Sequence, residues 1–167
     1  MEERVVIDRG RIAELYAVHA DDAARLAYLL TGDRDLAEDL VQDAFVKVAG
    51  RLVHLRDPDA FRPYLRKTIV NMSRSYFRRR KLERAHLEAT RPEVHHDNTT
   101  TALDREAMWE SLGRLTQRQR AAIVLRFYED LPEAQVAEIL KCRPGTVKSL
   151  VSRGLETLRN EVRGEDA

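Results

Sequence analysis

The stretch LPEAQVAEILKCRPGTVKSLVSRGLETLR, residues 131–159, decides the fold class that the sequence predicts. Its apolar residues recur at helical spacing on both sides of Pro144 and Gly145, which indicates two helices joined by a tight turn. A small residue, Ala137, stands where two such helices would cross. The other apolar positions give each helix an inner face: Val136, Ile139 and Leu140 in the first, Val147, Val151, Leu155 and Leu158 in the second. This arrangement is typical of a helix-turn-helix.

The second of these helices carries polar side chains on its outer side. They are Arg143, Thr146, Lys148, Ser149, Ser152 and Arg153. Side chains of these types contact phosphates and base edges in protein–DNA complexes. An amphipathic helix pair by itself more often belongs to an ordinary core, but Pro144-Gly145-Thr146 followed by Lys-Ser favours a DNA-reading helix. Which of the six side chains contact bases and which contact phosphates stays open.

Charge is distributed unevenly along the chain. The 167 residues carry 29 Lys and Arg against 28 Asp and Glu. Residues 1–50 hold eleven acids against six bases, whereas residues 51–84 hold eleven bases against three acids. Such asymmetry indicates two partners, one of them polyanionic, with two ordinarily solvated surfaces as the alternative. An apolar content of 43% suffices for one core or two small ones, and a charged content of 34% indicates a soluble protein.

Several kinds of site are not expected. The single cysteine, Cys142, excludes an internal disulfide and a cysteine zinc cluster, and it fits a reducing cytosol. No apolar run reaches the length of a membrane span, and the N-terminus lacks a signal-peptide pattern, so we expect a cytoplasmic protein without membrane insertion. His95, His96 and Asp97 are adjacent in a polar stretch and make a poor metal site. We therefore expect no metal and no cofactor.

Helical periodicity runs through most of the chain without an alternating strand pattern, which predicts an all-α fold of two small domains. The first domain is expected over residues 8–84, with helices over about 12–30 and 33–52 and a third from about 57 to 80 or beyond, bent near residues 71–75. Residues 85–102 are mostly polar and lack periodicity, which predicts a flexible linker. The second domain is expected over residues 103–162, with helices over about 103–115 and 117–128 before the helix-turn-helix. Thr116 is the expected N-cap of the latter helix, and Pro132 suits the first turn of the next.

Two blocks of the chain resemble one known family. The first holds GDRDLAEDLVQDAF (residues 32–45) and FRPYLRKTIVNMSRSYFRRRK (residues 61–81). The second holds LRFYEDLPEAQVAEIL (residues 125–140) and GTVKSLVSRGLETLR (residues 145–159). Together, in this order and spacing, they resemble the group IV, or extracytoplasmic function (ECF), sigma factors of the sigma-70 family of bacterial RNA polymerase. The likeness covers nearly the whole chain apart from the linker and the termini.

The resemblance implies that the second helix of the first domain docks on the β′ clamp helices of core RNA polymerase, while the second domain meets the β flap. The core-binding residues that it implies are Asp39, Leu40, Gln42, Asp43 and Phe45. Acids and an amide on adjoining helical positions suit a basic partner. An ordinary solvated acidic face is the alternative, and the apolar members can also serve the core.

The resemblance further implies that the basic third helix opens and reads the minus-ten promoter element. The implied residues are Asn71, Arg74, Tyr76, Arg78, Arg79, Arg80 and Lys81. Family members capture a flipped base in a loop that the likeness places at Asn71, and an amide can both donate to and accept from a base edge. Aromatic rings such as Tyr76 and Phe77 can stack on unpaired bases, although either ring can also face the core. The cations would bind phosphates, or form a basic solvated helix end.

The helix-turn-helix would read the minus-thirty-five element, with the helix over about 145–159 in the major groove and the six outward residues as contacts. Lys141 occupies a turn position that is commonly glycine, because the backbone there tends to be left-handed. We expect lysine to adopt this conformation at a cost of roughly 1 kcal/mol. Four further positions depart from the family pattern: Leu150 replaces an arginine, Gly154 an alanine, Tyr64 a frequent tryptophan and Pro132 a frequent serine cap. The first two weaken the transfer of a particular promoter sequence, and Tyr64 weakens the expectation of a role in melting at its position.

The function that follows from the resemblance is that of a transcription initiation factor. It would bind core polymerase, direct it to promoter DNA, and often be held inactive by an anti-sigma factor; it would not itself be an enzyme. The first alternative is a conventional helix-turn-helix regulator that never acts as a sigma subunit. The second is an enzyme with Glu38, Asp39 and Asp43 as metal ligands, which lacks a matching second carboxylate helix or a phosphate loop.

Overall fold

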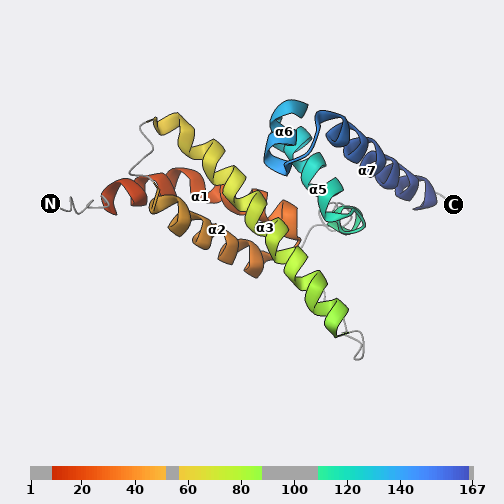
Figure 1. Cartoon of the computed structure of the whole chain (residues 1–167), viewed down its shortest axis with the longest axis horizontal. Helices are drawn as coiled ribbons and strands as arrows, with labels where there is room; N and C mark the ends of the chain where they lie inside the picture. The colour runs from red at the N-terminus through yellow and green to blue at the C-terminus, as the bar shows by residue number, and fades with distance from the viewer. Residues whose placement is uncertain (1–8, 52–56, 88–108, 166–167) are drawn as a thin grey trace. The chain divides into compact units, whose positions relative to one another are not determined.

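The computed structural model describes residues 9–51, 57–87 and 109–165 (Figure 1). Within these ranges every regular element is a helix, which confirms the all-α prediction. The elements are α1 (Arg9–Thr31), α2 (Arg34–Ala49), the 3₁₀ turn η2 (Pro58–Ala60), α3 (Phe61–His86), α5 (Gln117–Ile123), the π-helical segment η3 (Val124–Tyr128), α6 (Glu133–Leu140) and α7 (Pro144–Glu165). Residues 109–113 are also helical. The chain divides into two compact units, and the division falls after Ser73, within α3.

A tight turn joins α1 to α2, and Figure 1 shows the two helices side by side. Gly32 takes a left-handed φ of 70°, and its N–H donates to the carbonyl of Tyr28 at 2.8 Å, which ends α1. Asp33 then caps α2, because its carboxylate accepts from the N–H of Leu36 at 3.0 Å. The short connection forces the two helices to pack closely against each other.

The core of the first unit lies between α1, α2 and the beginning of α3. The fully buried side chains there include Ala27, Ala44, Val48, Phe61, Ile69 and Val70. The ring of Phe61 lies 5.1 Å from His19 and 5.9 Å from Phe45, so one aromatic side chain ties α3 to both other helices. Such tilted aromatic pairs add to the hydrophobic stabilisation from burial alone.

The third helix begins where the sequence predicts it. The carboxylate of Asp57 accepts from the N–H of Asp59 at 2.9 Å, and η2 then leads directly into α3. α3 runs unbroken from Phe61 to His86, through residues 71–75 where the sequence led us to expect a bend. The expected linker start was also early, since Ala85 and His86 still belong to the helix. The rest of the expected linker, from residue 88, lies outside the described residues.

In the second unit, Thr116 caps α5 as expected, in a complete capping box with Gln119. The Thr116 hydroxyl accepts from the N–H of Gln119 at 3.2 Å, and the Gln119 side chain accepts from the N–H of Thr116 at 3.1 Å. The helix then widens into η3, where the N–H of Glu129 donates five residues back to Val124. The sequence predicted the extent of this helix but not its π-helical end.

The turn between α6 and α7 is a Schellman motif with a lysine in the left-handed position. Lys141 has a φ of 52° and a ψ of 51°, which confirms the expected backbone conformation. The N–H of Cys142 donates to the carbonyl of Ala137 at 3.0 Å, and that of Lys141 to Glu138 at 3.3 Å. Pro132 is the N-cap of α6 rather than a residue of its first turn.

The helix α7 packs closely against α5 at Gly154. This glycine is buried, and a Cβ built on it would lie 2.5 Å from Cδ1 of Ile123. The absence of a side chain at this position therefore sets how near the two helices approach. In the described part of the chain no helix is both long and apolar enough to span a membrane.

Candidate nucleic-acid and protein interfaces

The outer side of α7 presents most of the residues that the sequence predicts for DNA contact. Arg143, Lys148, Ser149, Ser152 and Arg153 are exposed, and Thr146 is half-buried. The inner side is held by Val147, which is fully buried, and by the half-buried Val151. Ser149 directs its hydroxyl back to the carbonyl of Gly145 at 3.1 Å, so its oxygen remains able to accept. The structure thus brings the six residues together along one side and one end of a single helix.

Two contacts hold α7 and α5 in place away from this outer side. Arg114 Nε lies 3.2 Å from a carboxylate oxygen of Glu161, near the C-terminal end of α7. The guanidinium of Arg120, which is 5% exposed, lies 5.7 Å from the ring of Trp109. The first contact holds α7 without using its polar outer side, and the second joins α5 to the helical residues 109–113.

On α2 the predicted polymerase-binding residues separate into two groups. Asp39, Gln42 and Asp43 are exposed at i, i+3 and i+4, so they share one face of the helix. Leu40 and Phe45 are each only 6% exposed and belong to the core of the first unit. The structure therefore places these two side chains beneath the surface rather than on it.

Sequence reasoning missed one residue of this α2 face. Val46 follows Asp43 by three positions and is 73% exposed, although it is apolar. The α2 face thus consists of Asp39, Gln42, Asp43 and Val46, with two acids, an amide and one apolar side chain. The sequence contains one indication that Val46 shares this face: it follows Asp39 by seven positions, which is about two helical turns.

The predicted minus-ten residues lie on more than one side of α3. Asn71, Arg74 and Arg78 share a face at i, i+3 and i+7. Tyr76, five positions after Asn71, points about 140° away around the helix. Asn71 lies in the middle of the continuous helix, as the predicted third helix requires, although family members have a base-capturing loop at this place.

Tyr76 has close partners of its own. Its ring meets Phe77 edge-on at a centroid distance of 5.3 Å, and its hydroxyl accepts from Nη1 of Arg80 at 2.7 Å. The Arg80 guanidinium also lies 6.0 Å from the centre of the Tyr76 ring. Both rings are half-buried, while the remaining cations Arg79, Arg80 and Lys81 are exposed. Among the predicted residues of α3, the pKa of Arg74 lies below its ordinary value, first because of partial burial and then because of neighbouring cations such as Arg78.

The face that carries Asn71 begins earlier on α3 than the sequence indicated. Tyr64 and Lys67 precede Asn71 at the same helical spacing. We call the set Tyr64, Lys67, Asn71, Arg74 and Arg78 the α3 stripe. Arg51, just beyond α2, donates from Nη1 to the hydroxyl of Tyr64 at 2.7 Å and so adds a further cation at the stripe's beginning.

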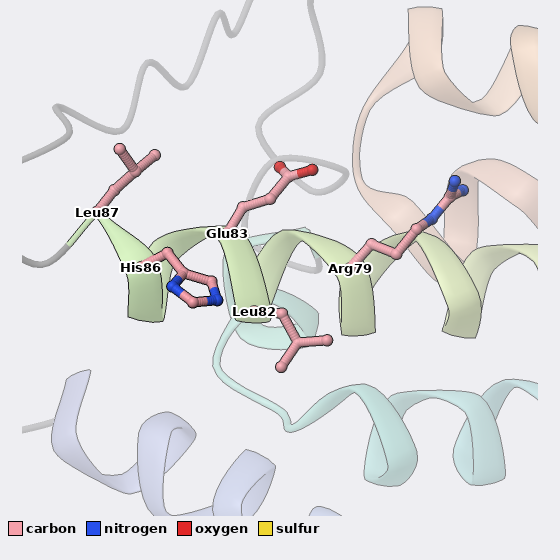
Figure 2. A pocket seen from close by; sticks show the side chains of 5 residues that line it. All are labelled: Arg79, Leu82, Glu83, His86 and Leu87. Atoms are coloured by element: carbon pink, nitrogen blue, oxygen red, sulfur yellow. The ribbon is translucent and has the colours of Figure 1, made fainter.

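One shallow hollow lies at the C-terminal end of α3. Figure 2 shows its lining, which is Arg79, Leu82, Glu83, His86 and Leu87. Leu82 and Leu87 are 60% and 56% exposed, so this end of the helix presents apolar surface to solvent. All five residues come from one helix and the residue that follows it, and the hollow is open rather than enclosed.

The described residues contain no group of three or more histidine, cysteine, aspartate or glutamate side chains that could hold a metal ion. Glu38, Asp39 and Asp43, considered above as metal ligands, therefore form no such group. His95, His96 and Asp97 lie outside the described residues.

Comparison with known proteins gives one consistent match. Residues 15–83 match the family model described as sigma-70 region 2, and residues 105–158 match that of sigma-70, region 4. The RNA polymerase sigma-E factor of Streptomyces avermitilis is 33% identical over 153 residues, which cover 92% of this chain and 86% of that protein. The RNA polymerase sigma factor SigV of Bacillus subtilis is 29% identical over 154 residues, which cover 89% of each protein.

Solved structures agree with these sequence matches. The sigma factor RpoE of Bartonella quintana, in complex with the anti-sigma factor NepR, superimposes with a TM-score of 0.73 at 25% identity, covering 90% of this chain and 96% of that one. CnrH, in complex with the cytosolic domain of CnrY, has a TM-score of 0.64 at 23% identity, covering 94% and 91% of the two chains. The second likeness shows a shared fold.

Proposed function

The chain belongs to the sigma-70 family, as an RNA polymerase sigma factor of the ECF type, and from this we propose how its surfaces divide the work of transcription initiation. The family match to both region 2 and region 4 carries the proposal, because a conventional helix-turn-helix regulator has no need of region 2. The protein binds core RNA polymerase and directs it to promoters. RNA synthesis itself remains the chemistry of the polymerase.

The α2 face is the docking surface for core polymerase. Asp39 and Asp43 supply negative charge for a basic partner, and Gln42 can donate and accept hydrogen bonds. Val46 adds apolar area, which interfaces need at their centre. Leu40 and Phe45 act indirectly, because they hold α2 against α1 and α3. By family resemblance the partner is the pair of β′ clamp helices, and the second domain meets the β flap.

The first domain, over residues 8–84, engages the minus-ten element through the α3 stripe. Its cations bind backbone phosphates, while the Asn71 amide is the member suited to a base edge. The Tyr76–Phe77 ring pair offers a separate stacking surface for an unpaired base. Arg79, Arg80 and Lys81 extend the positive charge toward the helix end.

The second domain, over residues 103–162, reads the minus-thirty-five element as duplex DNA. The outer side of α7 enters the major groove, with Arg143 and Thr146 near the helix beginning and the remaining four residues along the helix. The exposure of five of the six predicted residues supports this assignment. The linker proposed between the two domains covers residues 85–102, of which residues 85 and 86 extend α3.

An anti-sigma factor is a proposed further partner. The similar RpoE chain was solved in complex with the anti-sigma factor NepR, which supports a partner of this kind for this chain. Because the protein acts on RNA polymerase, we place it in the cytoplasm.

The test begins with the purified chain and bacterial core RNA polymerase, measuring association and then transcription from the region upstream of the protein's own gene. Complex formation with promoter-dependent transcripts supports the proposal. A failure to associate at low and moderate salt overturns it and favours the conventional regulator.

A charge reversal on the α2 face separates the two alternatives further. Asp39→Lys with Asp43→Lys should abolish association with core polymerase, whereas a conventional regulator would keep its DNA binding and its activity. The matched control reverses two exposed acids of α1, Asp21→Lys with Asp22→Lys, and should leave association unchanged.

A further inference from the structure

The junction between α2 and α3 holds an arginine in a fixed position on the surface. Nη1 of Arg51 donates to the hydroxyl of Tyr64 at 2.7 Å, across a sequence separation of 13 residues. Arg51 is exposed and Tyr64 is half-buried. The hydroxyl is a neutral partner, so this hydrogen bond orients the guanidinium without cancelling its charge.

The position of this pair matters because Tyr64 is the first residue of the α3 stripe. From Tyr64 to Arg78 the stripe extends about 21 Å at 1.5 Å per residue, which matches the rise of about six nucleotides along one strand of B-form DNA. Its own cations are Lys67, about one helical turn after Tyr64, and Arg74 and Arg78, farther toward the C-terminal end. Arg51, which follows α2, adds a positive charge at the N-terminal end, beside Tyr64 itself.

We propose that Arg51 and Tyr64 form a phosphate-binding site that anchors the promoter strand at the N-terminal end of the α3 stripe. A guanidinium has five N–H donors, and the hydrogen bond to Tyr64 uses one, so others can engage a phosphate in the bidentate manner that arginine favours. Tyr64 is the positioning residue, because its hydroxyl limits the rotamers of Arg51 before DNA arrives. The site rests on the proposed use of α3 in promoter binding and adds to it a contact from the end of α2.

A purely structural reading of the same contact makes a different prediction. If the hydrogen bond only fastened α2 to α3, the loss of either partner would lower stability slightly, as surface hydrogen bonds do. It would not change how promoter affinity depends on salt. A phosphate contact changes that dependence, because binding releases counterions in proportion to the phosphates neutralised.

The experiment uses holoenzyme assembled from core polymerase and the full chain, with a promoter fragment that the wild-type holoenzyme selects from random duplex DNA. Affinity is measured as a function of salt for Arg51→Gln, Tyr64→Phe and the double variant. Arg62→Gln is the matched control, because Arg62 is an exposed cation on the opposite side of α3 from Tyr64. Thermal unfolding of each free variant reports any effect on the fold.

We expect Arg51→Gln to reduce the steepness of the plot of log affinity against log salt by about 0.7–0.9. The ratio of wild-type affinity to variant affinity should therefore fall about threefold between roughly 0.05 and 0.2 M salt. Arg62→Gln should reproduce the wild-type slope. Tyr64→Phe should weaken binding less than Arg51→Gln does, and the effect of Arg51→Gln should be smaller in the Tyr64→Phe background. Such coupling is the signature of one residue positioning the other.

An unchanged slope for Arg51→Gln overturns the phosphate site, and additive effects of the two substitutions overturn the positioning role of Tyr64. Either result leaves the proposed function intact, since the wild-type holoenzyme still selects and binds its promoter. If the wild-type chain forms no holoenzyme or selects no DNA, the proposed function fails, and this inference fails with it.

Discussion

Substitution of Gly154 by alanine tests how closely α7 is seated on α5. Alanine is about 1 kcal/mol more favourable than glycine in a helix interior. Against this, the new Cβ would lie 2.5 Å from Cδ1 of Ile123, and a buried side chain that is pushed off its rotamer or overpacked costs about 1–3 kcal/mol. The free energy of unfolding should therefore fall by up to about 2 kcal/mol in Gly154→Ala.

The same change should stabilise the protein when the obstructing atom is absent. Ile123→Val removes Cδ1 and by itself costs about 0.5–1.5 kcal/mol. In that background the nearest remaining contacts of the new Cβ are about 3.5 Å, which is ordinary van der Waals distance. Gly154→Ala should then raise the free energy of unfolding by up to about 1 kcal/mol, which reverses the sign of the effect.

Urea unfolding followed by tryptophan fluorescence measures this directly, because the single tryptophan, Trp109, lies over Arg120 of α5 and reports on the second unit. Gly145→Ala is the control, since a Cβ at this position of α7 meets nothing within 4 Å. It should show no coupling to Ile123→Val. If Gly154→Ala were equally stabilising in both backgrounds, the argument that Gly154 sets the distance between α5 and α7 would be refuted.

Three other changes have defined outcomes. Lys141→Gly should raise the free energy of unfolding by about 0.5–1 kcal/mol in the same fluorescence assay, because it removes the left-handed strain of a residue with a side chain; a loss of stability would contradict this. Thr116→Ala should lower stability by about 1 kcal/mol, since it removes the hydroxyl that accepts from the N–H of Gln119 and so breaks one of the two bonds of the capping box, whereas Thr116→Ser should retain most of the stability. Arg153→Ala should weaken holoenzyme binding to the selected promoter, either by about 1–3 kcal/mol with relaxed preference at one base pair if Arg153 reads a base, or evenly across sequences with a smaller salt slope if it binds phosphate. Unaltered affinity and slope would exclude Arg153 from the interface.

Features that depend on neighbouring residues alone were predictable from the sequence. The cap at Thr116, the stop at Gly32 and the left-handed backbone at Lys141 each follow from a few adjacent side chains and a turn of fixed geometry. The outer side of α7 was predictable for a similar reason, because its apolar side repeats at helical spacing and leaves one side polar.

Features that depend on packing between distant segments were not. The sequence allowed Leu40 and Phe45 to lie on the surface of α2, since their burial depends on how α1 and α3 cover that helix. The hydrogen bond between Arg51 and Tyr64 joins two separate segments and has no local pattern. Family members have a base-capturing loop at the place of Asn71, whereas in this chain the predicted helix continues through this residue.

The unbroken path of α3 has a consequence for the kinds of sequence change that this protein can tolerate. Successive residues of a helix are rotated by about 100° about its axis. One residue inserted directly after Asn71 would therefore rotate all later side chains by this angle and move Arg74 and Arg78 out of the α3 stripe. Substitutions within the helix alter one contact at a time, but an insertion or deletion shifts Arg78 and the following cations together. We therefore expect α3 to accept exchanges of single residues far more readily than any change in its length.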